Sequence, residues 1–306
     1  MKQIVIMSGK GGTGKTFVSS SIAAIAGANA DAFGTTFADC DVDAANLHLM
    51  LHPTDTSCSD FVSGKLAEVD SDRCTGCGLC VDACRFDAVS LIGTDGRTRA
   101  LVDPIGCEGC GVCEYVCPEK AVALTEQRRG HWCVSRTPYG MLVHAHLEPG
   151  EENSGKLVAK VRDVAAERAR QTGADWILID GPPGTGCAAK SAITGTDYVL
   201  LVAEPTPSGI HDTLRVVDLA RHFRIPIGLV VNKADLAPHR TDELRRIVAE
   251  QAIAWLGEIP FSRAVPEALT TLTPYPIEHD DGITATLAAA WNRIRAELAP
   301  TAGVAG

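Results

Sequence analysis

The sequence has no basic excess and no hydrophobic run long enough to cross a membrane. Its 28 Lys and Arg residues face 38 Asp and Glu residues, which gives a net charge of −10. We therefore do not expect a general binder of nucleic acid or of anionic membranes. The longest uncharged, mostly apolar run near the N-terminus, residues 17–30, is too short to span a bilayer. The first residues show no basic segment and no cleavage site for export, so we expect a cytoplasmic protein without stable membrane insertion.

Cysteine, in contrast, is abundant, with 12 residues in a chain of 306. Without a secretion signal, so many cysteines indicate metal or cluster chemistry in a reducing compartment and not disulfides. Apolar residues make up 45% of the chain and charged residues 22%, which is typical of a globular protein with a substantial core.

Short apolar segments rich in β-branched residues alternate with helical segments along most of the chain. We predict strands over Gln3–Ser8, Asp175–Asp180, Asp197–Ala203 and Pro226–Asn232, and helices over Thr16–Ala28, Gly155–Arg170, Ser208–Phe223, Thr241–Ala254 and Thr284–Leu298. This alternation predicts an α/β fold in which a mostly parallel sheet is covered by helices on both faces.

Residues 66–126 break the alternation, because they contain no long helical segment and hold eight of the cysteines. The segment repeats itself with an offset of 33 residues. Cys74, Cys77, Cys80 and Cys84 correspond in this repeat to Cys107, Cys110, Cys113 and Cys117. Such self-similarity predicts two copies of one small unit packed together. We therefore expect a small α+β domain at 66–126, inserted into a larger domain formed by 1–65 and 127–306.

A glycine-rich segment follows the first predicted strand and reads GKGGTGKT. It fits the pattern G-x-x-x-x-G-K-[ST] at the start of a helix, where backbone N–H groups cradle phosphates. The predicted nucleotide-binding residues are Gly9, Lys10, Gly11, Gly12, Thr13, Gly14, Lys15 and Thr16. Lys15 is expected to reach the outer phosphates and Thr16 to bind Mg²⁺. The glycines also satisfy the dinucleotide pattern G-x-G-x-x-G, but that loop needs neither the lysine nor the hydroxyl.

Lys10, one residue into this loop, resembles the deviant Walker A lysine of MinD, ParA, Mrp and nitrogenase iron-protein relatives, the SIMIBI class of P-loop ATPases. In these families the lysine reaches across a dimer interface to the partner's nucleotide. The resemblance extends over the whole chain and implies an ATPase that forms a homodimer, or a heterodimer with a related ATPase. The alternative for Lys10 is a solvated lysine in a loop.

Two aspartates after predicted strands extend the resemblance. The run DCDVD at 39–43 is similar to the family's switch I, which implies that Asp41 positions the attacking water. The run DGPPG at 180–184 is similar to switch II, which implies that Asp180 acts on Mg²⁺ through water. Each run alone could be a turn or a helix cap. The implied catalytic residues are Lys10, Lys15 and Asp41, and the implied magnesium site comprises Thr16, Asp41 and Asp180.

Asn232 and Asp235 belong to an N-K-x-D segment that resembles the base-reading element of GTPases. That element leaves GTP open as the nucleotide, although the rest of the resemblance favours ATP. Residues 204–212 (EPTPSGIHD) also resemble the Mrp-type branch, without a chemical role that we can assign.

Each half of the predicted insert reads C-x₂-C-x₂-C-x₃-C, the bacterial ferredoxin spacing for [4Fe–4S] clusters, in which the fourth cysteine ligates the other cluster. The first cluster is expected on Cys74, Cys77, Cys80 and Cys117, and the second on Cys84, Cys107, Cys110 and Cys113. Zinc is the alternative, since paired cysteines also bind Zn²⁺. Arg85 replaces the proline that usually follows the fourth cysteine of such a run.

Cys187 lies just beyond the switch II segment, where the nitrogenase iron protein has a cysteine that binds a cluster shared between subunits. We expect an inert buried cysteine here, because no second ligand is evident. A third, dimer-bridging cluster is the alternative.

The combination of a nucleotide site with two clusters suggests that nucleotide state controls iron–sulfur chemistry. The resemblance to Mrp implies an Mg²⁺-dependent ATPase that assembles or transfers clusters to an acceptor protein. The resemblance to the nitrogenase iron protein implies an ATP-gated electron donor with a redox partner. A positioning ATPase like MinD or ParA, with structural or sensory clusters, is a third hypothesis.

Overall fold

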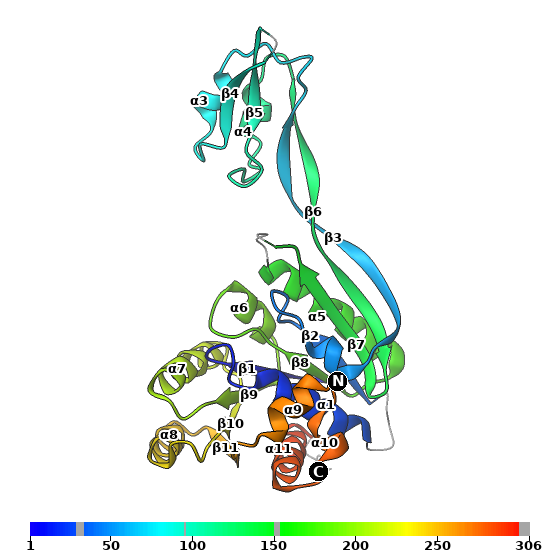
Figure 1. Ribbon diagram of the computed structural model, residues 1–306, viewed down its shortest axis with the longest axis vertical. Helices are drawn as coiled ribbons and strands as arrows, with labels where there is room; N and C mark the ends of the chain where they lie inside the picture. The colour runs from blue at the N-terminus through cyan, green and yellow to red at the C-terminus, as the bar shows by residue number, and fades with distance from the viewer. Residues whose placement is uncertain (29–33, 95, 150–153, 300–306) are drawn as a thin grey trace, which may run out of the picture. The chain divides into compact units, whose positions relative to one another are not determined.

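The computed structural model describes residues 1–28, 34–94, 96–149 and 154–299, and the chain divides into two compact units (Figure 1). Unit 1 comprises Met1–Ser59 and His131–Gly306, and unit 2 comprises Asp60–Gly130. Within the described residues, none of the helices combines the length and the apolar character needed to cross a membrane.

Unit 1 is built on a nine-stranded sheet with the order β11-β10-β9-β1-β8-β2-β7-β6-β3. Its strands are β1 (Lys2–Ser8), β2 (Thr35–Asp39), β3 (Thr54–Val69), β6 (Val122–Thr137), β7 (Gly140–Leu147), β8 (Trp176–Asp180), β9 (Tyr198–Ala203), β10 (Ile227–Asn232) and β11 (Ala254–Ile259). All pairings from β11 to β7 are parallel. Every residue of β9 and β10 is buried, as expected for strands covered on both faces. The prediction of a mostly parallel sheet is confirmed.

Helices cover both faces of this sheet, as predicted (Figure 1). They are α1 (Lys15–Ala28), α2 (Leu47–Leu51), α5 (Ser154–Thr172), α6 (Cys187–Ile193), α7 (Pro207–His222), α8 (Pro238–Glu250), α9 (Ala264–Thr270), α10 (Tyr275–Glu278) and α11 (Gly282–Leu298). Helix α1 packs against α2, α10 and α11, while α5 packs against α6 and against β2, β7 and β8. The main core combines alternate residues of the central strands with the apolar faces of α1 and α11.

One predicted helix is too long at its C-terminal end. The sequence predicts a helix over 241–254, whereas α8 ends at Glu250 and strand β11 begins at Ala254. Ala252 has a left-handed φ of 54°, which ends the helical path. Strand β11 itself was not predicted, and its pairing with β10 places it at the edge of the sheet.

Unit 2 contains two short helices, α3 (Leu79–Ala83) and α4 (Val112–Val116), and a hairpin of β4 (Val89–Thr94) and β5 (Arg97–Val102). Residues 60–69 of β3 and residues 122–130 of β6 belong to this unit as well. The two helices contact each other, and each is preceded by a glycine with a positive φ, 82° at Gly78 and 80° at Gly111. Cys84 and Cys117 follow the two helices at equivalent places. The internal repeat of the sequence is therefore a repeat of structure.

Candidate functional site

The glycine-rich segment forms the loop between β1 and α1, at the carboxyl end of a central strand. Gly14, the last residue of the loop, has a φ of 92°, a conformation that residues with a Cβ rarely adopt. The side-chain amide of Asn232 lies directly against Gly14, and its Nδ2 donates to the carbonyl oxygen of Thr13 at 2.9 Å. The end of β10 therefore braces the loop that leads into α1.

A cavity of about 810 Å³ opens beside this loop. The residues that line it include five of the loop and helix start (Gly11, Gly12, Gly14, Lys15 and Thr16), together with Asp41, Pro182, Pro183 and Cys187. The P-loop and both switch-like segments thus face one space, which is large enough for a nucleotide. Asn232 and Asp235 are not among the residues that line it.

Lys15 is buried and lies between two carboxylates. Its Nζ donates to Oδ1 of Asp180 at 2.8 Å and to Oδ2 of Asp41 at 3.3 Å. Burial alone would lower the pKa of Lys15, but the charges of Asp180 and Asp41 raise it to about 12. The ammonium is therefore charged at neutral pH, as phosphate binding requires.

Asp180 is fully buried at the end of β8 and is held by three donors. Besides Lys15, it accepts from Oγ of Ser19 at 2.8 Å and from Oγ1 of Thr16 at 3.3 Å. A hydroxyl beside a carboxylate is a set of hard oxygen donors that suits Mg²⁺. Burial raises the pKa of Asp41, the other aspartate of the predicted magnesium site. Because Lys15 contacts both aspartates and Thr16 contacts Asp180, the side chains of Thr16, Asp41 and Asp180 lie close together in the structure.

Asp39, at the end of β2, shapes the segment that carries Asp41. It is completely buried, and it accepts hydrogen bonds from the backbone N–H groups of Asp41, Asn46 and Leu47 at 3.0–3.2 Å. Burial and the nearby Asp180 raise the pKa of Asp39 to about 7. Sequence reasoning assigned no role to this aspartate, although its place as the first acidic residue after a buried strand was a usable signal.

Lys10 is bound within its own chain. Its Nζ lies 3.6 Å from Oε2 of Glu204 and 3.4 Å from Oγ of Ser208. The other oxygen of Glu204 pairs with Lys233. Glu204 thus joins the P-loop lysine to the N-K-x-D segment, and it was not predicted as a site residue. The sequence feature that could have identified Glu204 is its position directly after a predicted strand, in the unassigned segment 204–212.

Asp235 also has a structural contact, since its Oδ1 accepts from the backbone N–H of Phe261 at 2.6 Å. With the contact of Asn232 to the P-loop, the two predicted base-reading residues both connect loops around β10 and β11. Neither contact is one that a bound base makes.

The eight cysteines of unit 2 line two separate small cavities. The residues of the first, of about 20 Å³, include Cys74, Cys77, Cys80 and Cys117. The residues of the second, also of about 20 Å³, include Cys84, Cys107, Cys110 and Cys113. In each cavity the fourth cysteine comes from the other half of the repeat, because α3 and α4 pack side by side. Two backbone N–H groups already point at sulfur: Ala100 donates to Cys74 at 3.5 Å and Ala121 donates to Cys117 at 3.3 Å.

No group of three or more His, Cys, Asp or Glu side chains, among the residues that the structure describes, is arranged to hold a metal ion. A zinc site needs four donors around one point, at about 2.3 Å for sulfur.

Three of the remaining cysteines differ from expectation. Cys187 is exposed and lines the nucleotide-sized cavity, so the prediction that it is buried is wrong. Its position at the start of α6, directly after the switch II segment, keeps it at the surface of the cavity.

Cys58 and Cys133 form a disulfide, so the expectation of a chain without disulfides is also wrong. Adjacent strands bring them together across 75 residues of sequence. Cys40 is fully buried, and burial raises the pKa of its thiol.

Comparison with known proteins gives consistent matches. Residues 4–274 match the family described as the CobQ/CobB/MinD/ParA nucleotide binding domain. An uncharacterized protein of Methanocaldococcus jannaschii is 35% identical over 231 residues, which cover 76% of this chain and 78% of that protein. An iron–sulfur cluster carrier protein of Rickettsia typhi is 26% identical over 133 residues, covering 40% of this chain and 41% of that protein.

Among solved structures, the septum site-determining protein MinD of Pyrococcus horikoshii, complexed with Mg-ADP, has the same fold. It superposes with a TM-score of 0.59 and 18% identity, over 96% of this chain and 95% of that one.

Proposed function

Because the chain belongs to the CobQ/CobB/MinD/ParA nucleotide-binding family, we propose that it is an Mg²⁺-dependent ATPase that carries two [4Fe–4S] clusters in unit 2. Its nucleotide state is coupled to the assembly or transfer of iron–sulfur clusters to an acceptor protein. We place this activity in the cytoplasm, where thiols stay reduced.

The two cysteine-lined cavities are the observation that carries the iron–sulfur part of this proposal. Each presents four thiols with the fourth supplied by the other half of the repeat, as in a two-cluster ferredoxin. A cluster spreads its iron atoms over several corners, so its thiolates stand farther apart than those around one ion. The backbone N–H groups of Ala100 and Ala121 support the fit, since such donors tune a cluster's potential. When bound, the clusters would supply one-electron chemistry or serve as cargo.

The nucleotide part rests on the geometry around Lys15. The P-loop amides and Lys15 would bind the phosphates, and Thr16 with Asp180 would hold the Mg²⁺ that neutralises their charge. Asp41 lies in the same cavity, 3.3 Å from Lys15, where a water-positioning carboxylate is needed. The rest of the family resemblance favours ATP over GTP, and one oxygen of Asp235 is bound to the N–H of Phe261.

The resemblance of Lys10 to the deviant Walker A lysine favours a dimer, formed with a second copy or with a related ATPase. Because its ammonium is paired with Glu204 in the same chain, reaching a partner's nucleotide requires Lys10 to leave that carboxylate. A nucleotide-dependent exchange between the two positions would make dimerisation a step that Lys10 controls.

Anaerobic reconstitution tests the cluster assignment. We expect about eight irons and eight sulfides per chain and a low-temperature EPR signal on reduction. Cys117→Ser should remove the cluster of Cys74, Cys77 and Cys80, and Cys84→Ser should remove the other one. Cys187→Ser, which removes an exposed cysteine of unit 1, is the control and should leave the iron content unchanged.

Stoichiometric zinc without an EPR signal would refute the cluster part of the proposal. A cluster-loaded protein mixed with an acceptor then separates the two kinds of chemistry. Transfer of iron and sulfide supports the carrier function, whereas transfer of electrons alone would indicate an ATP-gated electron donor.

A further inference from the structure

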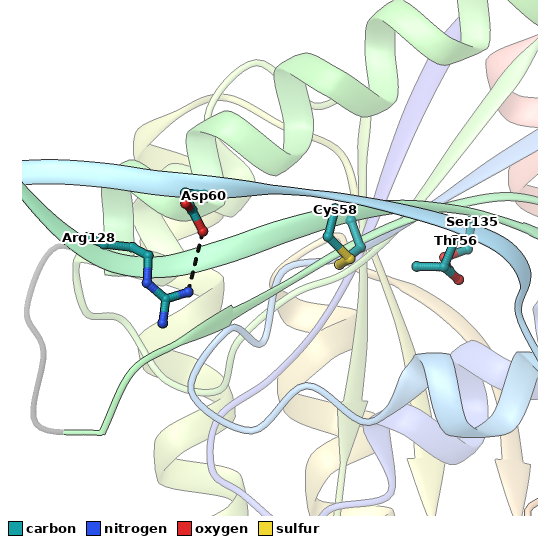
Figure 2. The surroundings of a disulfide bond; sticks show 6 residues. Thr56, Cys58, Asp60, Arg128 and Ser135 are labelled. Atoms are coloured by element: carbon teal, nitrogen blue, oxygen red, sulfur yellow. Dashed lines mark hydrogen bonds and ion pairs between the residues drawn. A yellow bond between two sulfur atoms is a disulfide. The ribbon is translucent and has the colours of Figure 1, made fainter.

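Cys58 and Cys133 join strands β3 and β6 of unit 1 through a disulfide (Figure 2). Their Cα atoms lie 4.1 Å apart, although 75 residues separate them in the sequence. We propose that this pair is a thiol–disulfide exchange site, which an external dithiol opens and the corresponding disulfide closes.

The two sulfurs of the pair differ in access. Strand β3 is the edge strand of the sheet and β6 lies next to it. Cys58, on the edge, is exposed, whereas Cys133, one strand further in, is only 2% exposed. Exchange requires a thiolate to approach one sulfur in line with the S–S bond, so access decides which sulfur is attacked. The attacked sulfur is therefore that of Cys58, and Cys133 is the leaving thiol.

The proposed function of unit 2 bears on this pair as well. Eight cysteines of this chain must be reduced to bind clusters, and all eight are free thiols in the structure. Conditions that keep exposed Cys77 and Cys110 reduced also act on an exposed disulfide of the same chain. A disulfide that is accessible at an edge strand exchanges with such reductants, unlike one enclosed in a core. The pair can therefore exchange with the same reductants that keep the cysteines of unit 2 reduced.

The exchange balances with a dithiol as the reductant. One thiolate of the dithiol attacks Cys58 Sγ and forms a mixed disulfide, while Cys133 leaves as a thiolate and takes up a proton. The second thiolate of the dithiol then attacks the sulfur that the dithiol contributed to the mixed disulfide. Cys58 is released as a thiolate and is protonated in turn. The dithiol loses two electrons and becomes a disulfide, and the protein gains two thiols.

Two side-chain contacts lie near the disulfide between these strands. Thr56 and Ser135 share a hydrogen bond of 2.8 Å between their hydroxyls, and Asp60 pairs with Arg128 at 3.3 Å (Figure 2). Both partners of the ion pair are more than half exposed, so it contributes little. Opening the disulfide removes the covalent link between the two strands, so the backbone hydrogen bonds between residues 54–59 and β6 should open more often.

The full-length native protein is equilibrated in buffers of reduced and oxidised dithiothreitol, then alkylated, digested and analysed by mass spectrometry. Peptide-level readout separates Cys58 and Cys133 from the cysteines of unit 2. We expect both to titrate together as one two-electron couple. In the reduced state, amide exchange of residues 54–59 should rise severalfold. Thr56→Ala, which removes the neighbouring hydrogen bond but no thiol, is the control and should leave the couple unchanged.

Single-cysteine variants test the order of attack. With Cys133→Ser, Cys58 should form a mixed disulfide with glutathione disulfide readily. With Cys58→Ser, Cys133 should react roughly a hundredfold more slowly, because it needs local opening.

Three results would overturn the proposal: a disulfide that resists dithiothreitol unless the protein is denatured, two thiols that stay unpaired in oxidised dithiothreitol, or equal reactivity of the two variants. The experiment is repeated on cluster-free protein. The couple of Cys58 and Cys133 is then read without clusters, whereas a missing iron signal after reconstitution refutes the clusters and leaves this couple untouched.

Discussion

Alanine substitutions at Gly76 and Gly109 should each disrupt one of the two cysteine-lined cavities. The two glycines occupy equivalent positions of the repeat, with φ values of 69° and 61°. A Cβ on Gly76 would collide with the carbonyl group of Thr98, and one on Gly109 with that of Lys65. In both cases the carbonyl carbon would lie 2.8 Å from the added atom. Each glycine also lies between two cysteines that line the same cavity.

The magnitude has two parts. A left-handed conformation costs an alanine about 1–2 kcal/mol relative to glycine. The collision adds roughly 1–3 kcal/mol, because backbone atoms cannot move aside as the end of a flexible side chain can. Gly78→Ala is the matched control, since its φ is 82° but its nearest neighbour, Cδ1 of Leu91, would be 3.7 Å away. It should show the first part alone. Gly76→Ala should therefore destabilise unit 2 by about 2–5 kcal/mol and Gly78→Ala by about 1–2 kcal/mol.

Denaturant unfolding of the cluster-free protein and iron content after reconstitution measure these effects separately. We expect Gly76→Ala to lose close to half of the iron, and Gly109→Ala to lose the other half, while Gly78→Ala keeps most of it. Equal destabilisation by Gly76→Ala and Gly78→Ala would show that the close approach of the backbone carbonyl has no energetic consequence, and the reasoning would fail.

Three further predictions concern unit 1. Lys15→Ala should abolish nucleotide binding, measured by calorimetry, because it removes the buried charge that faces the phosphates. Lys10→Ala should keep binding but lose ATP hydrolysis, measured by phosphate release, and ATP-dependent dimerisation, measured by light scattering. Wild-type hydrolysis by Lys10→Ala would contradict the family-based role of this lysine. Asp41→Ala should trap the ATP-bound state, so redox titrations with ATP and with ADP should give different cluster potentials. A shift of about 60 mV corresponds to a change of roughly tenfold in ATP affinity. Identical potentials and identical cluster-transfer rates with both nucleotides would show that unit 2 is not coupled to the nucleotide site. Burial, and then the neighbouring imidazoles, lower the pKa of His144 to about 4, so the unfolded chain binds more protons between about pH 4 and pH 6.5. Stability should therefore fall as the pH drops through this window, by at most about 3 kcal/mol, and His144→Gln should flatten the slope in urea titrations at pH 7 and pH 5.

Features that depend on short stretches of sequence could be predicted. The P-loop needs only a strand, a run of glycines and a helix start, all within residues 3–28, and the structure places them in that order. The apolar runs of the central strands are buried on both faces, so each run signals a strand by itself. The spacing of the cysteines in unit 2 likewise repeats after 33 residues, and the ferredoxin pattern that it matches predicts a division of the eight thiols into two sets of four.

Contacts between distant segments were decided only by the tertiary structure. The disulfide depends on the register of β3 against β6, and no local pattern sets that register across 75 residues. The pairing of Lys10 with Glu204 depends on β9 lying beside β1, where the ends of parallel strands meet at one edge of the sheet. Asp39 acts through three backbone N–H groups that converge on it only after the chain turns into α2. Sequence identifies which residues can carry chemistry, whereas packing of the strands determines which partner each of them meets.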